Sequence, residues 1–223
     1  MTRIWEAFNA TDGWQRLLEH VQLSLTALLL AAVVGIALGI AAAKTGRAGS
    51  FLVSSSALVV RMVPTFAAMA IVMALTSIGF RPAVFALTIL GVAPVLFNVA
   101  TGIANADPEA VSAATGIGMT ATQRFVQVEV PLALPFLFTG LRTASVMIVA
   151  TAALAGAIGA GGLGITIVAG FSNNQDDVLL AGAIPIALLA LALEAGLLGL
   201  QRAATPEGLR TLQHRSQLFR RQT

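Results

Sequence analysis

The sequence predicts an all-α integral membrane protein with about five transmembrane helices. Of its 223 residues 57% are hydrophobic and only 10% are charged, whereas soluble domains carry about 25% charged residues. A helix needs roughly 20 apolar residues to cross a bilayer, and backbone polar groups in hydrocarbon must be satisfied within the segment. Uncharged runs of suitable length follow one another along the chain, at 21–43, 62–80, 82–106, 143–175 and 178–193.

Residues 1–19 precede the first apolar run, and we predict that they form an interfacial segment. They carry five charged side chains and no continuous apolar core, which distinguishes them from a cleavable signal peptide. Trp5, Phe8 and Trp14 suit the boundary between membrane and water, where tryptophan is enriched.

The transmembrane domain is predicted over residues 20–201. Pro64 lies inside the second span, and residues 48–60 are too few to cross the bilayer alone, so we expect one helix that is kinked near Pro64. The fourth span is expected to begin after Pro131 and Pro135 and to run to about residue 157. The other four spans are predicted at about 20–43, 51–78, 82–105 and 178–201.

Positive charges predict a multi-pass protein of the cell (inner) membrane with its amino terminus outside and its carboxyl terminus in the cytoplasm. Lys44 and Arg47 follow the first span, and five arginines lie in the tail at 202–223. Short loops rich in lysine and arginine face the cytoplasm, and five spans place both groups on that side. The tail is therefore interpreted as an orientation signal rather than a nucleic-acid patch. The polar segment 107–131, between spans three and four, is also expected in the cytoplasm.

The first half of the polar segment has the features of a helix start. Asp107 is a good N-cap, Pro108 suits the first helical position and Glu109 favours the first turn. Residues 108–115 are long enough for about two helical turns. Small side chains along this helix would allow a partner backbone to approach closely, at Ala110, Ser112, Ala113 and Ala114.

The second half predicts a turn and another short helix. Gly116 and Gly118 can end the first helix and reverse the chain. Thr120 is expected to cap a second helix that runs to about Val128 and is ended by Pro131. Two short helices joined by glycines would form a compact projection that fits a groove.

The segment 107–131, DPEAVSAATGIGMTATQRFVQVEVP, resembles the cytoplasmic signature loop of ABC importer permeases. That loop reads Glu-Ala-Ala, three residues, Gly, nine residues, Ile-x-Leu-Pro. Here the matching positions are Ala113-Ala114, Gly118 and Val128-x-Val130-Pro131. Ser112 stands where the family usually has its glutamate, and Glu109, one helical turn earlier, can partly replace it.

The resemblance implies that this loop docks on an ATP-hydrolysing subunit. ATPase-coupling residues are then expected at Glu109, Ser112, Ala113, Ala114, Gly118, Val128 and Pro131. The implied partners are ABC ATPase subunits, an external substrate-binding protein and a second permease subunit, identical or paralogous. The chain has no GxxxxGK[ST] motif, so we expect ATP and magnesium on a separate ATPase, and neither catalysis nor a bound cofactor or metal here.

Further segments resemble permeases for glycine betaine, choline and related osmoprotectants: 63–90, GIGMT at 116–120, 131–144 and AGAIGAGGLG at 155–164. Import of such compounds is therefore the expected function. Two alternatives stay open, a permease for methionine or another amino acid and an ion-coupled secondary transporter. The second usually needs intramembrane acids, of which the spans contain only Glu194.

Candidate residues for the substrate path lie near prolines inside the predicted spans. Interrupted helices can line a path in transporters, which suggests Phe66, Pro94, Phe97 and Asn98. A quaternary ammonium is usually held by aromatic rings, but the chain has no tyrosine and both tryptophans precede the first span. We therefore expect high-affinity recognition in the binding protein and a weak, neutral passage here.

Three ionisable residues lie inside the predicted spans, at similar depths. They are Arg61, Arg142 and Glu194. A lone charge near the middle of a membrane costs about 2.5–3.5 kcal/mol. We therefore predict that Glu194 faces the protein interior and contacts Arg61 or Arg142. The alternative is that each arginine extends towards the inner interface.

Two other patterns are set aside. Gly159-x-Gly161-x-x-Gly164 matches a dinucleotide fingerprint in letters only, because a βαβ unit is missing. Close helix packing at the outer end of span four is the simpler interpretation, and a gating role is left open. His20 and His214 lie at opposite ends of the chain, which makes a histidine metal site improbable.

Overall fold

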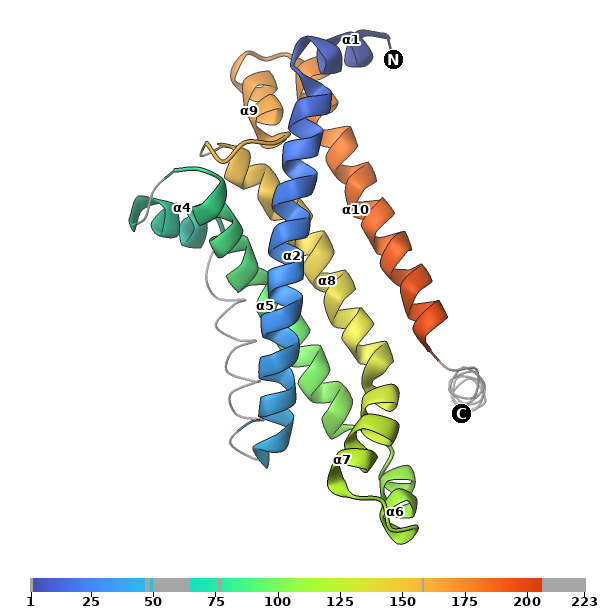
Figure 1. Cartoon of the computed structure of the whole chain (residues 1–223). Coiled ribbons are helices and arrows are strands. Elements are labelled where there is room, and N and C mark those ends of the chain that lie inside the picture. Colours follow the sequence, from blue (N-terminus) through green and yellow to red (C-terminus); the bar gives the residue numbers. More distant parts are fainter. Residues whose placement is uncertain (1, 47–48, 50–64, 76–77, 158, 206–223) are drawn as a thin grey trace, which may run out of the picture.

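A computed structural model of the chain describes residues 2–46, 49, 65–75, 78–157 and 159–205. Every regular element among them is helical (Figure 1). The elements are α1 (Thr2–Ala10), α2 (Gly13–Lys44), α4 (Thr65–Leu75), α5 (Phe80–Ala104), α6 (Pro108–Gly116), α7 (Ala121–Arg124), a π-helical turn (Phe125–Glu129), α8 (Val130–Ala157), α9 (Gly164–Ser172) and α10 (Asp176–Ala204). The predicted all-α fold is confirmed.

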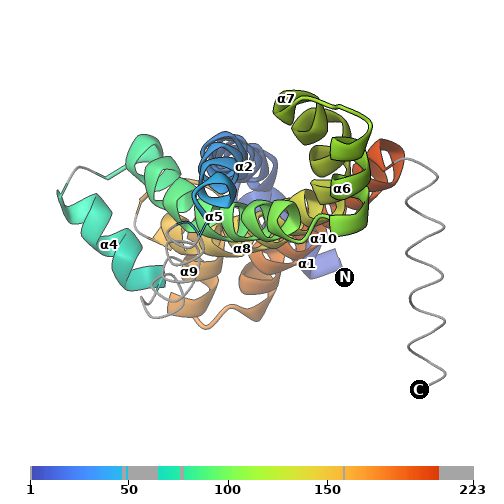
Figure 2. The ribbon, with the colours of Figure 1, turned by 90° about the horizontal axis from the view of Figure 1, so that it is seen from below.

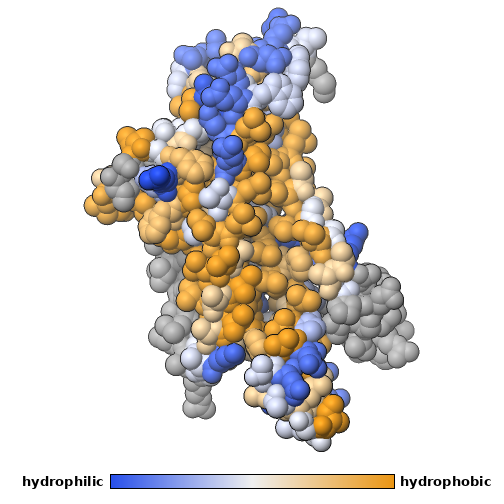
Figure 3. All heavy atoms as spheres, viewed as in Figure 1, coloured by the Kyte–Doolittle hydropathy of each residue, from blue (hydrophilic) through white to orange (hydrophobic). Residues whose placement is uncertain are grey.

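Four helices are long and apolar enough to cross a membrane: Gly13–Lys44, Phe80–Ala104, Ala121–Gly156 and Asp176–Ala204. They correspond to four of the five predicted spans. Most of the predicted second span, with its kink at Pro64, lies outside the described residues. The surface shows a broad apolar belt between two polar ends (Figure 3), as expected for a protein solvated by lipid over its middle.

Helices α2 and α5 pack in parallel along a seam of small residues. On α2 every fourth residue is small and buried, at Ala27, Ala31, Gly35 and Gly39. A Cβ added to Gly35 would lie 2.7 Å from the Cβ of Val95, and one added to Gly39 would lie 2.8 Å from the Cβ of Val99. Glycine is therefore needed for this close approach of two backbones.

The parallel direction of α2 and α5 bears on the number of spans. Lys44 at the end of α2 and Phe80 at the start of α5 lie towards opposite ends of the bundle (Figure 1). Residues 47–48, 50–64 and 76–77 lie outside the description, so the expected further crossing at 51–78 stays a prediction.

Helix α8 runs antiparallel to α5, and α10 packs on the other side of α8 (Figure 2). Gly140 of α8 fits against Pro94 and Asn98, while Gly102 of α5 fits against Phe136. A first apolar core fills the space between α2, α5 and α8. A second and smaller core lies between α1, α8, α10 and the connector that precedes α9. It contains Phe8, Val149, Leu163, Ala181 and Ile186.

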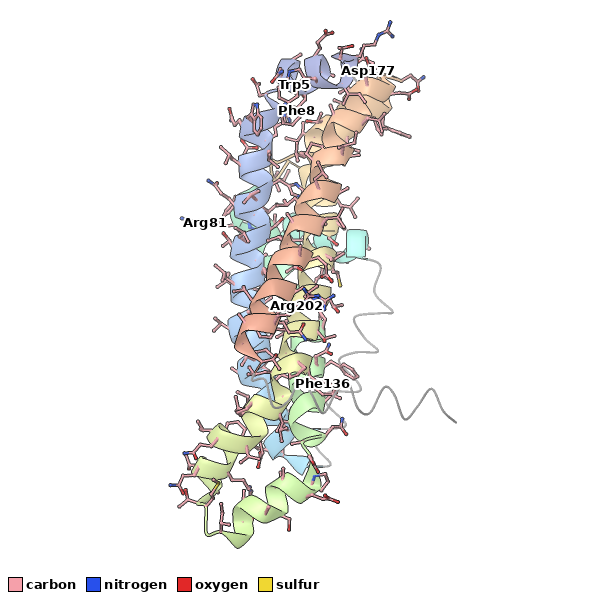
Figure 4. The ribbon with its side chains drawn as sticks, turned by 90° about the vertical axis from the view of Figure 1, so that its right-hand side faces the viewer. Trp5, Phe8, Arg81, Phe136, Asp177 and Arg202 are labelled. Atoms are coloured by element: carbon pink, nitrogen blue, oxygen red, sulfur yellow. The ribbon has the colours of Figure 1, made fainter. Side chains whose placement is uncertain are left out.

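The amino-terminal helix α1 lies across the end of the bundle (Figure 4). Phe8 is buried and stacks on Trp5 at 5.9 Å between ring centroids, while Trp14 meets Phe8 edge-on at 5.4 Å. Trp5 and Trp14 themselves are more than half exposed. Exposed indoles beside a buried phenylalanine suit the membrane boundary. The chain turns at Asp12, so α2 begins at Gly13, earlier than the expected start at residue 20.

Two expectations about helix ends are wrong. Pro131 does not end the second short helix, and span four does not begin after Pro135, because the helix continues from Ala121 through both prolines. In the π turn the N–H of Val130 bonds to the carbonyl of Phe125, five residues back. This wider turn gives room for the ring of Pro131 and for its missing N–H.

The connector after α8 also differs from the expectation, because it contains the helix α9. The predicted close packing of its glycines is confirmed. A Cβ added to Gly164 would lie 1.9 Å from the carbonyl oxygen of Ala153, and one added to Gly170 would lie 2.3 Å from the nitrogen of Leu179. Glycines therefore fix α9 against both α8 and α10.

Candidate functional site

The polar knob, residues 107–129, projects from one end of the bundle (Figures 1 and 2). Its first helix, α6, starts as predicted: the carboxylate of Asp107 accepts the N–H of Glu109 at 2.9 Å, and Pro108 occupies the first turn. These interactions satisfy a free N–H at the helix start without a partner from elsewhere. The start of α6 is therefore determined by its own sequence.

Gly118 ends α6 in a Schellman motif. Its φ is +83°, its N–H bonds to the carbonyl of Thr115 at 3.1 Å, and the N–H of Met119 bonds to the carbonyl of Ala114 at 3.1 Å. This pattern requires a left-handed residue just after the helix, where glycine carries no Cβ penalty. Of the two glycines predicted to end this helix and reverse the chain, Gly118 is the one at the turn. Gly116 remains the last residue of α6.

The second helix of the knob begins with a complete capping box. The N–H of Thr120 donates to Gln123 Oε1 at 2.9 Å, and the N–H of Gln123 donates to Thr120 Oγ1 at 3.3 Å. This reciprocal pair satisfies two N–H groups at the start of α7. The cap predicted at Thr120 is confirmed.

Arg124 braces the knob internally. Its Nε donates to Glu129 Oε1 at 3.0 Å across the π turn, and its Nη1 donates to Thr115 Oγ1 of α6 at 3.4 Å. One side chain thus ties the base of α8 to the projecting helix. The pair is partly exposed, and ion pairs near the surface contribute about 0–1 kcal/mol, so we assign Arg124 to orientation of the knob more than to stability.

A contact with Lys44 connects the knob to the end of α2. The Lys44 Nζ lies 4.3 Å from the centre of the Phe125 ring, which is the geometry of a cation–π interaction. Phe125 begins the π turn, so α2 contacts the junction between α7 and α8. The sequence analysis missed this pair, because 81 residues separate its members and neither is unusual alone.

The predicted coupling residues divide by exposure. Glu109, Ser112, Ala113 and Gly118 are exposed, whereas Ala114 is buried and Val128 and Pro131 are half-buried. The first four are therefore available to a partner, and the other three support the knob. Ile117 was not among the candidates, yet it is 76% exposed in the knob. A large apolar side chain inside a polar segment is the signal that identifies it.

The predicted path residues are only partly brought together. Pro94 and Asn98 are half-buried at the crossing of α5 and α8, and Asn98 Nδ2 donates to the carbonyl of Pro94 at 2.8 Å. Its amide is therefore used within its own helix. Phe97 is 41% exposed on the outside of α5. Phe66 lies in α4, and its side chain is outside the described part of the structure.

The predicted contact between intramembrane charges is present. Arg142 Nε donates to Glu194 Oε1 at 2.7 Å, and Nη2 donates to the same oxygen. The pair joins α8 to α10, and each side chain keeps about 30% of its surface exposed in the isolated chain. Arg61, the other candidate partner, lies outside the described residues.

The sequence has relatives of similar length. It is 34% identical over 205 residues to the glycine betaine/carnitine/choline transport system permease protein OpuCB of Bacillus subtilis, covering 91% of this chain and 94% of the relative. It is 36% identical over 197 residues to the osmoprotectant import permease protein OsmW of Salmonella typhimurium, covering 86% and 91%. The choline permease OpuBB of Bacillus subtilis is 32% identical, with 94% and 97% covered.

Solved structures share the fold. An inward-facing MetNI methionine ABC transporter superposes with a TM-score of 0.74 at 21% identity, covering 86% of this chain and 95% of the matched chain. An amino acid ABC transporter with histidines gives a TM-score of 0.65 at 18% identity, covering 88% and 96%. The model of the family described as binding-protein-dependent transport system inner membrane component matches residues 35–206. With the capped knob at one end of an apolar helical bundle, these matches show that the chain belongs to that family.

Proposed function

We propose that the chain is the permease subunit of an ATP-binding-cassette importer for osmoprotectants such as glycine betaine, choline or related quaternary amines. The observation that carries the proposal is the knob, a capped pair of short helices that projects from an apolar bundle. The names of the relatives support the substrate class. The likeness to methionine and amino acid transporters stays below 25% identity, so it supports the fold and no particular substrate.

Membership in the family sets aside the ion-coupled carrier and makes the chain a multi-pass transport component. In such a system an external binding protein delivers the substrate, and a separate ATPase subunit hydrolyses ATP. We infer that a second permease subunit completes the path. This chain then binds no cofactor or metal, and ATP with magnesium stays on the ATPase.

The knob suits the transmission of motion. Glu109, Ser112 and Ala113 form an exposed surface of α6 for the ATPase. Helix continues from Ala121 to Gly156 without a break, which is roughly 50 Å at 1.5 Å per residue. A displacement of the docked knob therefore moves the whole of α8. The contact between Lys44 and Phe125 transmits part of this displacement to α2.

Selectivity for a quaternary amine belongs mainly to the binding protein. Both tryptophans lie at the α1 end of the bundle, and the chain has no tyrosine. Cation–π contacts contribute about 0.5–2 kcal/mol per ring, so the few phenylalanines of the spans offer weak binding. A weak site suits a path through which the substrate must also leave.

Uptake into vesicles tests the proposed function. The chain is reconstituted with an ABC ATPase subunit and a substrate-binding protein from the same organism, and uptake of labelled glycine betaine, choline and methionine is measured. We expect ATP-dependent uptake of the first two, with unlabelled glycine betaine or choline competing and methionine not competing. Uptake of methionine alone, or uptake driven by an ion gradient without ATP, would contradict the proposal.

The proposed orientation has the knob in the cytoplasm and α1 outside. Lys44 lies beside the knob, and α1 lies at the other end of the bundle. The chain contains no cysteine, so single cysteines report each side directly. We expect externally added impermeant thiol reagents to label Asn9→Cys and Asn173→Cys and to leave Thr45→Cys and Thr122→Cys unlabelled.

These four positions are exposed and avoid special backbone sites. Asp12 and Asn174 have positive φ, and Thr120 caps α7, so cysteine there would disturb the fold. Labelling after permeabilisation confirms that the shielded cysteines are reactive. External labelling of Thr122→Cys in sealed cells would reverse the orientation and exclude docking of the knob on a cytoplasmic ATPase.

A further inference from the structure

Two polar contacts join distant segments at the end of the bundle that lies opposite the knob. Glu19 Oε2 accepts the N–H of Gly162 at 2.9 Å, and its other oxygen accepts from Gln15 at 3.1 Å. His20 Nε2 lies 3.1 Å from the carbonyl of Val149. Because a carbonyl oxygen can only accept, Nε2 carries the proton and donates. Neighbouring residues of α2 therefore hold both the connector and α8.

The fit around His20 is close and incompletely satisfied. His20 is fully buried, and a Cβ added to Gly162 would lie 3.2 Å from its Nδ1. Within the described part of the chain Nδ1 has no hydrogen-bond partner. A buried nitrogen without a hydrogen-bond partner costs free energy. This cost makes the closed arrangement less stable than its tight packing alone would suggest.

The connector lies between the two apolar cores of the molecule. Ala160 belongs to the core of α2, α5 and α8, whereas Leu163 belongs to the core of α1, α8 and α10. Gly162, which Glu19 holds, lies between them in sequence. Gly159, Gly161 and Gly162 all have positive φ, so the connector has glycines at the positions where its backbone turns. The connector therefore contributes to both cores, and Glu19 ties it to α2 between them.

We propose that Glu19 and His20 form a releasable clasp that closes the end of the bundle opposite the knob. When the clasp releases its contacts to Gly162 and Val149, the adjoining end of α8 moves away from α2 together with α9 and α10, which pack on it, and that end of the bundle opens. Glu19 is half-buried and makes no ion pair among the described residues, so water can replace Gly162 as its partner. The role of this opening in substrate entry rests on the proposed importer function, whereas the clasp itself does not.

Distances between spin labels test the clasp without any partner protein. Leu18→Cys on α2 and Ser172→Cys on α9 are labelled in the full chain in lipid nanodiscs; both positions are exposed. We expect one short distance in the otherwise unchanged chain. Glu19→Ala should raise the population of molecules with a longer distance roughly tenfold or more over that of the unchanged chain, because a hydrogen bond to a charged group is lost. Glu19→Gln, which keeps an acceptor for Gly162, should give a smaller rise.

Gln15→Ala is the matched control, because Gln15 lies one turn earlier on α2 and contacts only Glu19 among the described hydrogen bonds. Its distance distribution should equal that of the unchanged chain. An unchanged single distance in Glu19→Ala and His20→Leu would overturn the clasp, whether or not the melting temperature falls. A lower melting temperature with one distance would mean that the two residues serve stability alone.

A second measurement connects the clasp to transport. In vesicles that contain the ATPase, Glu19→Ala is expected to raise ATP hydrolysis without binding protein several-fold, because the closed end no longer resists motion of α8. If hydrolysis stays unchanged while the longer distance is present, the clasp has no part in coupling and the transport role is overturned. If no ATPase associates with the unchanged chain, the proposed function fails and the distance measurement still decides the clasp.

Discussion

Replacement of Gly118 by leucine is expected to lower substrate uptake at least tenfold while membrane insertion stays intact. Gly118 has φ +83° at the end of α6, and a residue with a side chain pays about 1–2 kcal/mol in that region. No atom lies within 4 Å of a Cβ added there, so the strain comes from the backbone and not from crowding. Leucine therefore favours a turn that points α6 in a different direction.

Two further variants isolate this cause. Gly116→Leu adds the same side chain two residues earlier, where space is also open and φ is helical; it should keep most of the uptake. Gly118→Asn should recover part of the uptake, because asparagine tolerates the left-handed region. Uptake and ATPase co-purification are measured in the same vesicles. Equal loss in the Gly116 and Gly118 variants would show that bulk on the docking surface, and not the turn, is responsible.

Local interactions are the part of the site that the sequence predicts well. Asp107, Thr120 and Gly118 act on backbone groups within four residues, so the identity of the residue and its position are enough to predict the cap or turn. The contact of Arg142 with Glu194 was predictable for a different reason. A charge inside hydrocarbon needs a partner, and few candidates share its depth.

Other features depend on information that composition does not carry. The uncharged run 143–175 includes the end of α8, the connector and α9, and hydropathy cannot divide three apolar segments. Pro131 is tolerated because a π turn precedes it, and nothing in FVQVE marks that turn. The bond from Gly162 to Glu19 joins residues 143 positions apart, and a single sequence gives no sign of such pairing.

The ion pair between Arg142 and Glu194 is expected to have the second large effect, on stability. Arg142→Leu and Glu194→Leu each leave one charge without its partner on the surface between α8 and α10. An unpaired charge at this depth costs about 2.5–3.5 kcal/mol, so each single variant should lower the free energy of unfolding by about 2 kcal/mol or more, allowing for partial exposure. Uptake should fall with it, because α10 separates from α8.

The double variant Arg142→Leu with Glu194→Leu separates pairing from packing. Replacement of both charges by apolar side chains removes the unpaired charge, and such replacements are often neutral or stabilising. Unfolding in detergent should therefore place the double variant close to the unchanged chain, with a coupling energy of about 2 kcal/mol or more. Arg202→Leu, an exposed arginine near the end of α10 (Figure 4), should change stability by about 0.5 kcal/mol at most. If the two single losses instead add in the double variant, each side chain acts through its own packing, and the pair does not hold α8 to α10.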